Sequence, residues 1–171
     1  MSEEEKRMKR CCFTGHRPEK LQYSEEQVKS ALSEAISNAY ADGFSTFITG
    51  MARGVDIWAA ELVLALKAQH PEIRLICALP HPDFEMRWKA EWQYRYRAVL
   101  SQSDLVQTIC PAYSKGAYQK RNEWMVDHSA RLIAVFNGEP GGTRNTIAYA
   151  KMTGVMVVNV DNIVAKGTNK N

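Results

Sequence analysis

The sequence is poor in the residues that mark several special protein classes. Cysteine occurs four times and proline six times in 171 residues, and no apolar run approaches the roughly 20 residues that a membrane helix needs. The first ten residues, MSEEEKRMKR, are charged and lack the apolar segment of a secretory signal peptide. These absences exclude a disulfide-dense miniprotein, a collagen-like chain and a membrane-spanning chain. We therefore expect a cytoplasmic protein that does not contact a membrane.

The four cysteines are spread over three parts of the chain, at Cys11, Cys12, Cys77 and Cys110. None belongs to a C-x-x-C pair, and none has a histidine at a spacing typical of zinc ligands. We expect reduced, mostly buried thiols and no metal site.

The sequence also has no large excess of positively or negatively charged residues. The chain has 22 Lys and Arg against 19 Asp and Glu, a formal net charge of +3. This surplus is too small to indicate nucleic-acid binding by itself. The hydrophobic share of 45% and the charged share of 24% are typical of a globular protein, and the length suits one domain.

Short apolar runs alternate with longer helical patterns along the chain. The runs predict strands over 10–15, 46–49, 73–79, 104–110, 131–136 and 155–160. The longer patterns predict helices over 25–41, 55–69, 84–101, 118–129 and 143–153. This alternation predicts an α/β fold, a single Rossmann-like three-layer α/β/α domain with a mainly parallel sheet of about six strands. We expect a charged tail over 1–9, the domain over 10–164 and a frayed tail over 165–171.

Three unusual loops follow the first, second and fifth predicted strands. They read TGHRP from Thr14, GMARGVD from Gly50 and GEPGGT from Gly138. Ligands of parallel sheets bind beyond the carboxyl ends of the strands, where the strand order reverses. With a strand order of 3-2-1-4-5, the three loops would lie side by side.

These loops suit a phosphate or pyrophosphate. Glycine allows close approach of the backbone, and the N-terminus of the following helix attracts an anion. Arg17 and Arg53 add charge, and Thr143 and Thr146 add hydroxyl groups. The candidate ligand-binding residues of the loops are Thr14, Gly15, His16, Arg17, Gly50, Arg53, Gly54, Asp56, Gly141, Gly142, Thr143 and Thr146.

Each of these features also has a purely structural interpretation. A glycine-rich turn can simply begin a helix, Asp56 can satisfy backbone N–H groups at a helix start, and Thr143 can be an N-cap. His16 can be a surface histidine. Neither G-x-G-x-x-G nor G-x-x-x-x-G-K-[ST] is present, which argues against an NAD dehydrogenase and a P-loop NTPase.

Aromatic and basic residues alternate over 84–101. They could stack on single-stranded nucleic acid. However, Phe84, Trp88, Trp92, Tyr96 and Val99 fall near one helical stripe, which favours a buried face.

Three segments resemble known families. TGMARGVDIWAAE, over 49–61, resembles the S-G-x-A-x-G-[IV]-D-x-x-A-H segment of the DNA-processing protein DprA. In the segment 120–146, Arg121 and Asn122 resemble the R-N pair of DprA, while Arg121, Met125 and the P-G-G run from Pro140 resemble the R-K-x-x-M and P-G-G-x-G-T motifs of the Lonely-guy phosphoribohydrolases. The opening CCFTGHRPEKL, over 11–21, resembles the YpsA/YoqJ family. All belong to the SLOG superfamily of Rossmann-like domains.

The resemblance implies a pocket for a nucleotide-derived ligand, with ADP-ribose-like molecules as the leading class and no other cofactor required. It implies a phosphate cradle formed by Gly15, Gly50, Gly54, Gly141, Gly142 and Thr143. It places Arg121, with Asn122 beside it, toward the ribose or phosphate, and makes Arg121 the candidate catalytic residue if the protein is an enzyme. Because self-association is common in the superfamily, we expect a homodimer.

One departure from the phosphoribohydrolase pattern bears on catalysis. Those enzymes carry a glutamate shortly after the Gly-Gly-Thr turn, whereas no carboxylate occurs here between Gly142 and Asp161. Glycoside cleavage needs a carboxylate near the sugar, and only Glu139 and Asp56 are nearby substitutes. We therefore expect binding or sensing of the ligand without catalysis. Hydrolysis of nucleoside monophosphates and DprA-like binding of single-stranded nucleic acid remain the alternatives.

Overall fold

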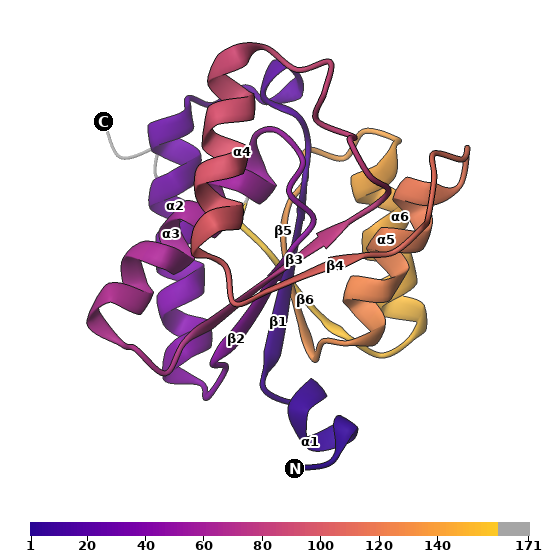
Figure 1. The fold of residues 1–171 in the computed structure, drawn as a ribbon. Coiled ribbons are helices and arrows are strands. Elements are labelled where there is room, and N and C mark those ends of the chain that lie inside the picture. The colour runs from indigo at the N-terminus through magenta and orange to yellow at the C-terminus, as the bar shows by residue number, and fades with distance from the viewer. Residues whose placement is uncertain (161–171) are drawn as a thin grey trace.

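Six strands form one all-parallel sheet in a computed structural model that describes residues 1–160 (Figure 1). The strands are β1 (Arg10–Gly15), β2 (Thr46–Thr49), β3 (Arg74–Leu79), β4 (Leu105–Thr108), β5 (Arg131–Val135) and β6 (Met156–Asn159). The predicted Rossmann-like α/β fold is confirmed. The predicted domain end at residue 164 and the tail over 165–171 lie outside the described residues.

The strand order differs from the expected 3-2-1-4-5. It is β4-β3-β2-β1-β5-β6, so that β5, and not β4, lies beside β1. From β1 to β4, each strand lies beside the previous one, on the same side of it. The connection through α5 (Ala117–Asp127) then returns the chain to the other side of β1, where β5 lies. The order therefore reverses between β1 and β5, and the loops after β2, β1 and β5 begin at neighbouring strand ends.

Helices cover both faces of the sheet (Figure 1). On one face, α3 (Val55–Gln69) packs on β1, β2 and β3, and α2 (Glu25–Ala41) and α4 (Ala90–Gln102) pack against α3. On the other face, α5 and α6 (Gly142–Met152) pack on each other and on the strands around β1. The buried apolar residues form two clusters, because alternate residues of each strand point to opposite faces.

The start of α2 shows why the sequence predicts its bounds correctly. The Ser24 hydroxyl accepts a hydrogen bond from the Gln27 N–H at 3.2 Å, and the Gln27 side chain accepts one from the Ser24 N–H at 2.9 Å. This capping box fixes the first turn. Ser2 and Glu5 form the same motif at the start of α1 (Glu3–Arg7), within the predicted charged tail.

The predicted helix over 84–101 begins too early. Residues 84–87 form turns, Trp88 lies in a bend, and α4 begins only at Ala90. Asp83 has a φ of 60°, and Lys89 is extended, so the backbone before α4 is not helical. The aromatic residues of the predicted stripe still point inward: Phe84 and Tyr96 are buried in the core, and Trp88 and Trp92 pack against it.

The four cysteines are buried and free. No helix within residues 1–160 is long and apolar enough to cross a bilayer. A short 3-10 helix, η1 (Pro18–Lys20), follows the loop after β1.

Candidate functional site

A cavity of about 380 Å³ lies at the carboxyl ends of the central strands. This volume is within the usual range for small-molecule sites. Ten of the fourteen candidate residues line it: Thr14, Gly15, His16, Arg17, Asp56, Arg121, Asn122, Gly141, Gly142 and Thr143. The loop after β1, the start of α3, the first turns of α5 and the start of α6 thus meet around one space.

Three further residues line the cavity that the sequence analysis did not select: Lys20, Ala52 and Tyr118. The sequence spacing does indicate Tyr118, because it lies three residues before Arg121 and so on the same face of a helix. Lys20 comes to the cavity through η1, which lies outside the predicted strands and helices.

Four candidate residues do not line the cavity: Gly50, Arg53, Gly54 and Thr146. The Thr146 hydroxyl donates to the Gly142 carbonyl oxygen at 2.8 Å, within the first turn of α6. Arg53 forms an ion pair with Glu19 at 3.1 Å, which links the start of α3 to η1.

Two glycines permit the close packing of the first and second loops. A Cβ at Gly15 would lie 2.5 Å from the Val55 side chain at the start of α3. Gly54 has a φ of +89°, and a Cβ there would lie 2.8 Å from Pro18 Cδ. Larger residues at either position would separate the β1 loop from α3.

The N-terminus of α6 forms one wall. Its N-cap, Gly141, has a φ of 145° and provides no side-chain cap. The first N–H groups of a helix have no partner within the helix, and Gly142 and Thr143, the first two residues of α6, line the cavity. Because the helix dipole adds partial positive charge here, this wall suits an anion.

Arg121 is buried at the back of the cavity, with 3% of its surface exposed. Its Nε donates to Asn122 Oδ1 at 2.8 Å, and its Nη1 donates to the Gly50 carbonyl oxygen. The Arg121 Cζ lies 5.7 Å from the centre of the Tyr118 ring. Arg121 therefore holds the end of β2 while it also supplies positive charge to the cavity.

Asp56 is the buried carboxylate of the site. Its Oδ2 accepts a hydrogen bond from the Ala52 N–H at 3.2 Å, as a helix-start acid would. Burial raises the pKa of Asp56 to about 6, although the charge of Arg121 and the Ala52 N–H act to lower it. Burial likewise lowers the pKa of Arg121, and Asp56 opposes that shift.

Two aromatic side chains, His16 and Tyr118, line the cavity. The His16 ring stacks on Phe136 with the ring centres 5.7 Å apart. Tyr118 lies at the start of α5, and its ring contacts His81 edge-on, with the ring centres 5.9 Å apart. The lining of the cavity thus combines cations, backbone N–H groups and two flat side chains.

Comparisons with known proteins identify the family of the chain and several relatives. The family model of YpsA, described as the YspA SLOG family, matches residues 11–159. The chain is 36% identical over 119 residues to the uncharacterized SPbeta prophage-derived protein YoqJ of Bacillus subtilis, covering 63% of this chain and 70% of YoqJ. It is 28% identical over 156 residues to a UPF0398 protein of Bacillus cereus strain G9842, covering 86% and 85% of the two chains.

Among solved structures, the chain resembles DNA processing protein A from Helicobacter pylori, described for its single-stranded DNA binding mode. The TM-score is 0.64 at 18% sequence identity, over 97% of this chain and 75% of that one. At this identity the likeness concerns the fold alone.

Proposed function

Because the chain belongs to the YpsA SLOG family, we propose that it binds a nucleotide-derived ligand of the ADP-ribose class in the cavity between β1, α5 and α6. SLOG membership implies a nucleotide-derived ligand in general. The ADP-ribose class is the one that the family resemblance implies, and the assignment of the site comes from the residues that line the cavity.

One observation carries the proposal: the α6 N-terminus, Arg17 and Arg121 line the same cavity. A phosphate group there receives backbone N–H donors at Gly142 and Thr143 and positive charge from both arginines. Charge-assisted hydrogen bonds of this kind contribute about 1.5 to 3 kcal/mol each.

Different lining residues suit different parts of the ligand. The phosphates lie at the α6 N-terminus, where the backbone N–H groups are. The base and ribose extend past Asn122 toward Tyr118, whose aromatic ring offers stacking. Lys20 also lines the cavity and adds a further cation.

The test is a calorimetric titration of the protein with ADP-ribose, AMP and ribose 5-phosphate. Gly142→Asp places a carboxylate in the anion cradle, and we expect it to weaken ADP-ribose binding at least tenfold. Because acidic residues are favourable in the first turn of a helix, this variant keeps α6 intact.

Met152→Asp is the matched control. Met152 is the exposed last residue of the same helix, about 15 Å along the helix axis from Gly142, and this variant should bind ADP-ribose like the unmodified protein. Equal binding by Gly142→Asp, or no binding of any of the three compounds by the unmodified protein, would overturn the proposal.

Hydrolysis of the N-glycosidic bond is the second candidate, and Asp56 favours it. It is a buried carboxyl group in the cavity with a pKa raised to about 6, a value suited to general acid–base work near neutral pH. Incubation with AMP, followed by chromatography for free adenine, tests this activity. Asp56→Asn should abolish adenine release while ADP-ribose binding persists; release that continues in this variant excludes Asp56 as the catalytic group.

DprA-like binding of single-stranded nucleic acid is the third candidate, and the aromatic stripe argues against it. Phe84 and Tyr96 are buried, and Trp88 and Trp92 pack against the same core. These four rings therefore offer little exposed surface on which single-stranded nucleic acid could stack. If oligonucleotide binding occurs and weakens steeply with salt, this candidate replaces the small-ligand proposal.

A further inference from the structure

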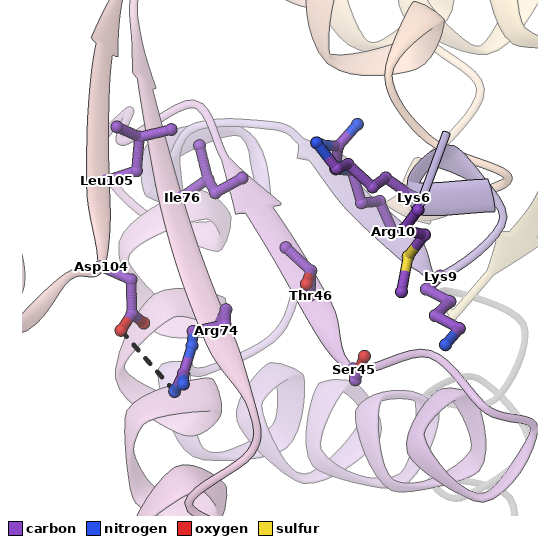
Figure 2. Close-up of a pocket in the computed structure, with 10 residues that line it drawn as sticks. Lys6, Lys9, Arg10, Ser45, Thr46, Arg74, Ile76, Asp104 and Leu105 are labelled. Atoms are coloured by element: carbon purple, nitrogen blue, oxygen red, sulfur yellow. Dashed lines mark ion pairs between the residues drawn. The ribbon is translucent and has the colours of Figure 1, made fainter. Parts of the chain in front are cut away.

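A second cavity, of about 330 Å³, lies at the amino-terminal end of the sheet, the end opposite to the candidate site (Figure 2). We call it the basal cavity. Cationic and hydroxyl side chains from α1, from the starts of the first three strands and from the residues just before β1 and β2 line it: Lys6, Lys9, Arg10, Ser45, Thr46 and Arg74. One carboxylate, Asp104, also lines it, so the cations outnumber the acid.

The strand register determines how these groups are spaced. Arg10 pairs with Thr46 across β1 and β2, and Thr46 pairs with Arg74 across β2 and β3. Paired residues of neighbouring strands point to the same face of a sheet, and neighbouring strands are about 4.8 Å apart. Two arginines therefore project from the same face with Cα atoms about 10 Å apart and a threonine between them.

Figure 2 shows the cations in two groups, with Thr46 and Ser45 between them. Lys6, Lys9 and Arg10 lie on one side, and Arg74 lies on the other. An anion with charges along its length can contact both groups, whereas a single compact charge reaches only one.

Several of the cationic donors have capacity left for a ligand. Arg10 Nη1 is buried and has no hydrogen-bond acceptor among the described residues; its nearest carboxylate oxygen, on Glu3, is 3.7 Å away. Lys9 forms no ion pair within residues 1–160. Arg74 lies 4.0 Å from Asp104 and has a side chain that is 54% exposed.

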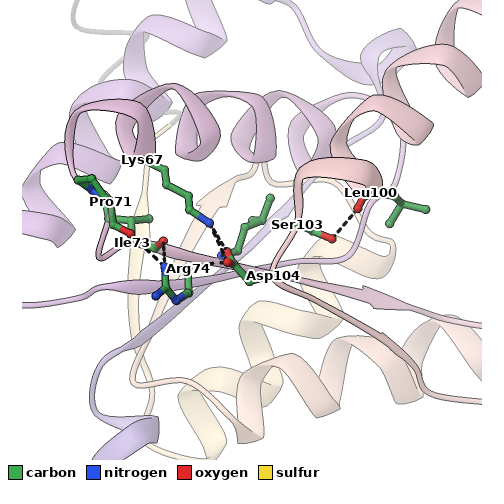
Figure 3. Close-up of polar contacts among 8 residues, drawn as sticks. Lys67, Pro71, Ile73, Arg74, Leu100, Ser103 and Asp104 are labelled. Carbon is green, nitrogen blue, oxygen red and sulfur yellow. Dashed lines mark hydrogen bonds and ion pairs between the residues drawn. The ribbon is translucent and has the colours of Figure 1, made fainter.

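The one acid of the basal cavity is already neutralised by other groups. Both Asp104 oxygens accept hydrogen bonds from Lys67 Nζ at 2.7 Å (Figure 3). Asp104 Oδ2 also accepts from the Leu75 N–H at 2.8 Å. Burial acts to raise the pKa of Asp104, but these partners lower it overall, so the carboxylate stays ionised and bound to Lys67. Arg74 Nη1 donates to the Pro71 carbonyl oxygen at 3.0 Å, so its Nε and Nη2 are the donors that remain available to a ligand.

Glu3 is the other acid near the cations. It pairs with Lys6 at 2.9 Å and faces Arg10, and its side chain is 73% exposed. A surface ion pair of this kind is worth about 1 kcal/mol or less. A multivalent anion can therefore displace it.

We propose that the basal cavity binds a polyphosphate chain, either inorganic or carried by a nucleoside. The phosphates bridge the group around Arg10 and the group around Arg74, with the Thr46 hydroxyl between them. Ile76 and Leu105 form an apolar patch beside the cations, and the Leu105 side chain is exposed enough to contact a nucleoside. This site is separate from the proposed ADP-ribose site and does not depend on it.

The test uses calorimetric titration with inorganic tripolyphosphate and, in parallel, with ATP. All variants carry Gly142→Asp, which removes the anion cradle of the candidate site. Arg74→Gln and Lys9→Gln should each weaken tripolyphosphate binding about tenfold, as the loss of one charge-assisted hydrogen bond predicts. Both residues are exposed, so the fold should be unchanged, which thermal unfolding checks.

Arg97→Gln is the matched control, because Arg97 is an exposed arginine on α4 that contacts Gln93 instead. It should leave binding unchanged, and Glu3→Gln should strengthen it.

Tighter binding of ATP than of tripolyphosphate identifies the ligand as a nucleoside polyphosphate, and equal or weaker binding identifies it as inorganic. The proposal is overturned if Arg74→Gln and Lys9→Gln bind like Arg97→Gln, or if the Gly142→Asp protein takes up neither compound.

Discussion

Arg121 on α5 donates a hydrogen bond to the carbonyl oxygen of Gly50, the residue that follows β2. The same Nη1 lies 3.5 Å from the Ala78 carbonyl oxygen on β3. A buried guanidinium thus ties one helix to two strand ends. Loss of ligand binding after removal of Arg121 would therefore mix a binding effect with a structural one.

Gly50→Ala tests this arrangement without removing a charge. The added Cβ would lie 2.9 Å from both Arg121 Cζ and Asp56 Oδ2. We expect a loss of about 1 to 3 kcal/mol in the free energy of unfolding, as for other insertions into packed sites, together with weaker ADP-ribose binding. Urea denaturation measures the first and calorimetry the second. A variant as stable as the unmodified protein would mean that Arg121 has room to move.

Asp56 should make stability depend on pH in an unusual direction. Because its folded-state pKa, about 6, lies above the ordinary aspartate value of 3.8, the folded protein holds a proton that the unfolded chain has released. The stability contributed by the protonated carboxyl is therefore present at low pH and is lost as pH rises from about 4 to 6. Two pKa units correspond to about 3 kcal/mol.

The measurement is the free energy of urea unfolding at several pH values, for the unmodified protein and for Asp56→Asn. The difference between them isolates Asp56 from the other titrating groups. We expect Asp56→Asn to gain relative stability as pH rises through this window. A difference that stays constant from pH 4 to pH 7 would contradict the raised pKa.

Gly15→Ala should be strongly destabilising, because its Cβ would lie 2.5 Å from Val55 Cβ at the start of α3. We expect a loss of about 1 to 3 kcal/mol, seen as a lower unfolding midpoint. Gly116→Ala is the matched control: it has a φ of −97° and no neighbour within 4 Å of the added carbon, so its midpoint should stay the same or rise slightly. If both variants unfold alike, α3 does not pack closely on the β1 loop.

The two loop arginines should behave differently. Arg17 lines the cavity, whereas Arg53 is paired with Glu19 outside it. We expect Arg17→Ala to weaken ADP-ribose binding about tenfold or more, since it removes a charged donor, and Arg53→Ala to change binding less than twofold. Titrations of the two variants at one salt concentration compare them directly. A larger effect at Arg53 would mean that the phosphates bind on the side of η1 where Arg53 pairs with Glu19, outside the cavity.

Much of the fold follows from local pattern. The bounds predicted for the helix over 25–41 and for the strands over 10–15 and 46–49 agree with those of α2, β1 and β2. Capping residues and apolar runs act within a few residues of themselves, so the sequence displays them directly. The aromatic spacing over 84–101 does not reveal the start of α4, because Asp83 and Lys89 adopt backbone conformations that are not helical.

By itself, the sequence determined the α/β alternation, the buried faces and the three glycine-rich loops after strands, because each depends on neighbours along the chain. The tertiary structure decided which strand lies beside β1, and hence which loop ends meet. It also turned Arg53 toward Glu19 and brought Lys20 and Tyr118 to the cavity. These outcomes depend on contacts between segments far apart in sequence, whose packing no local pattern specifies.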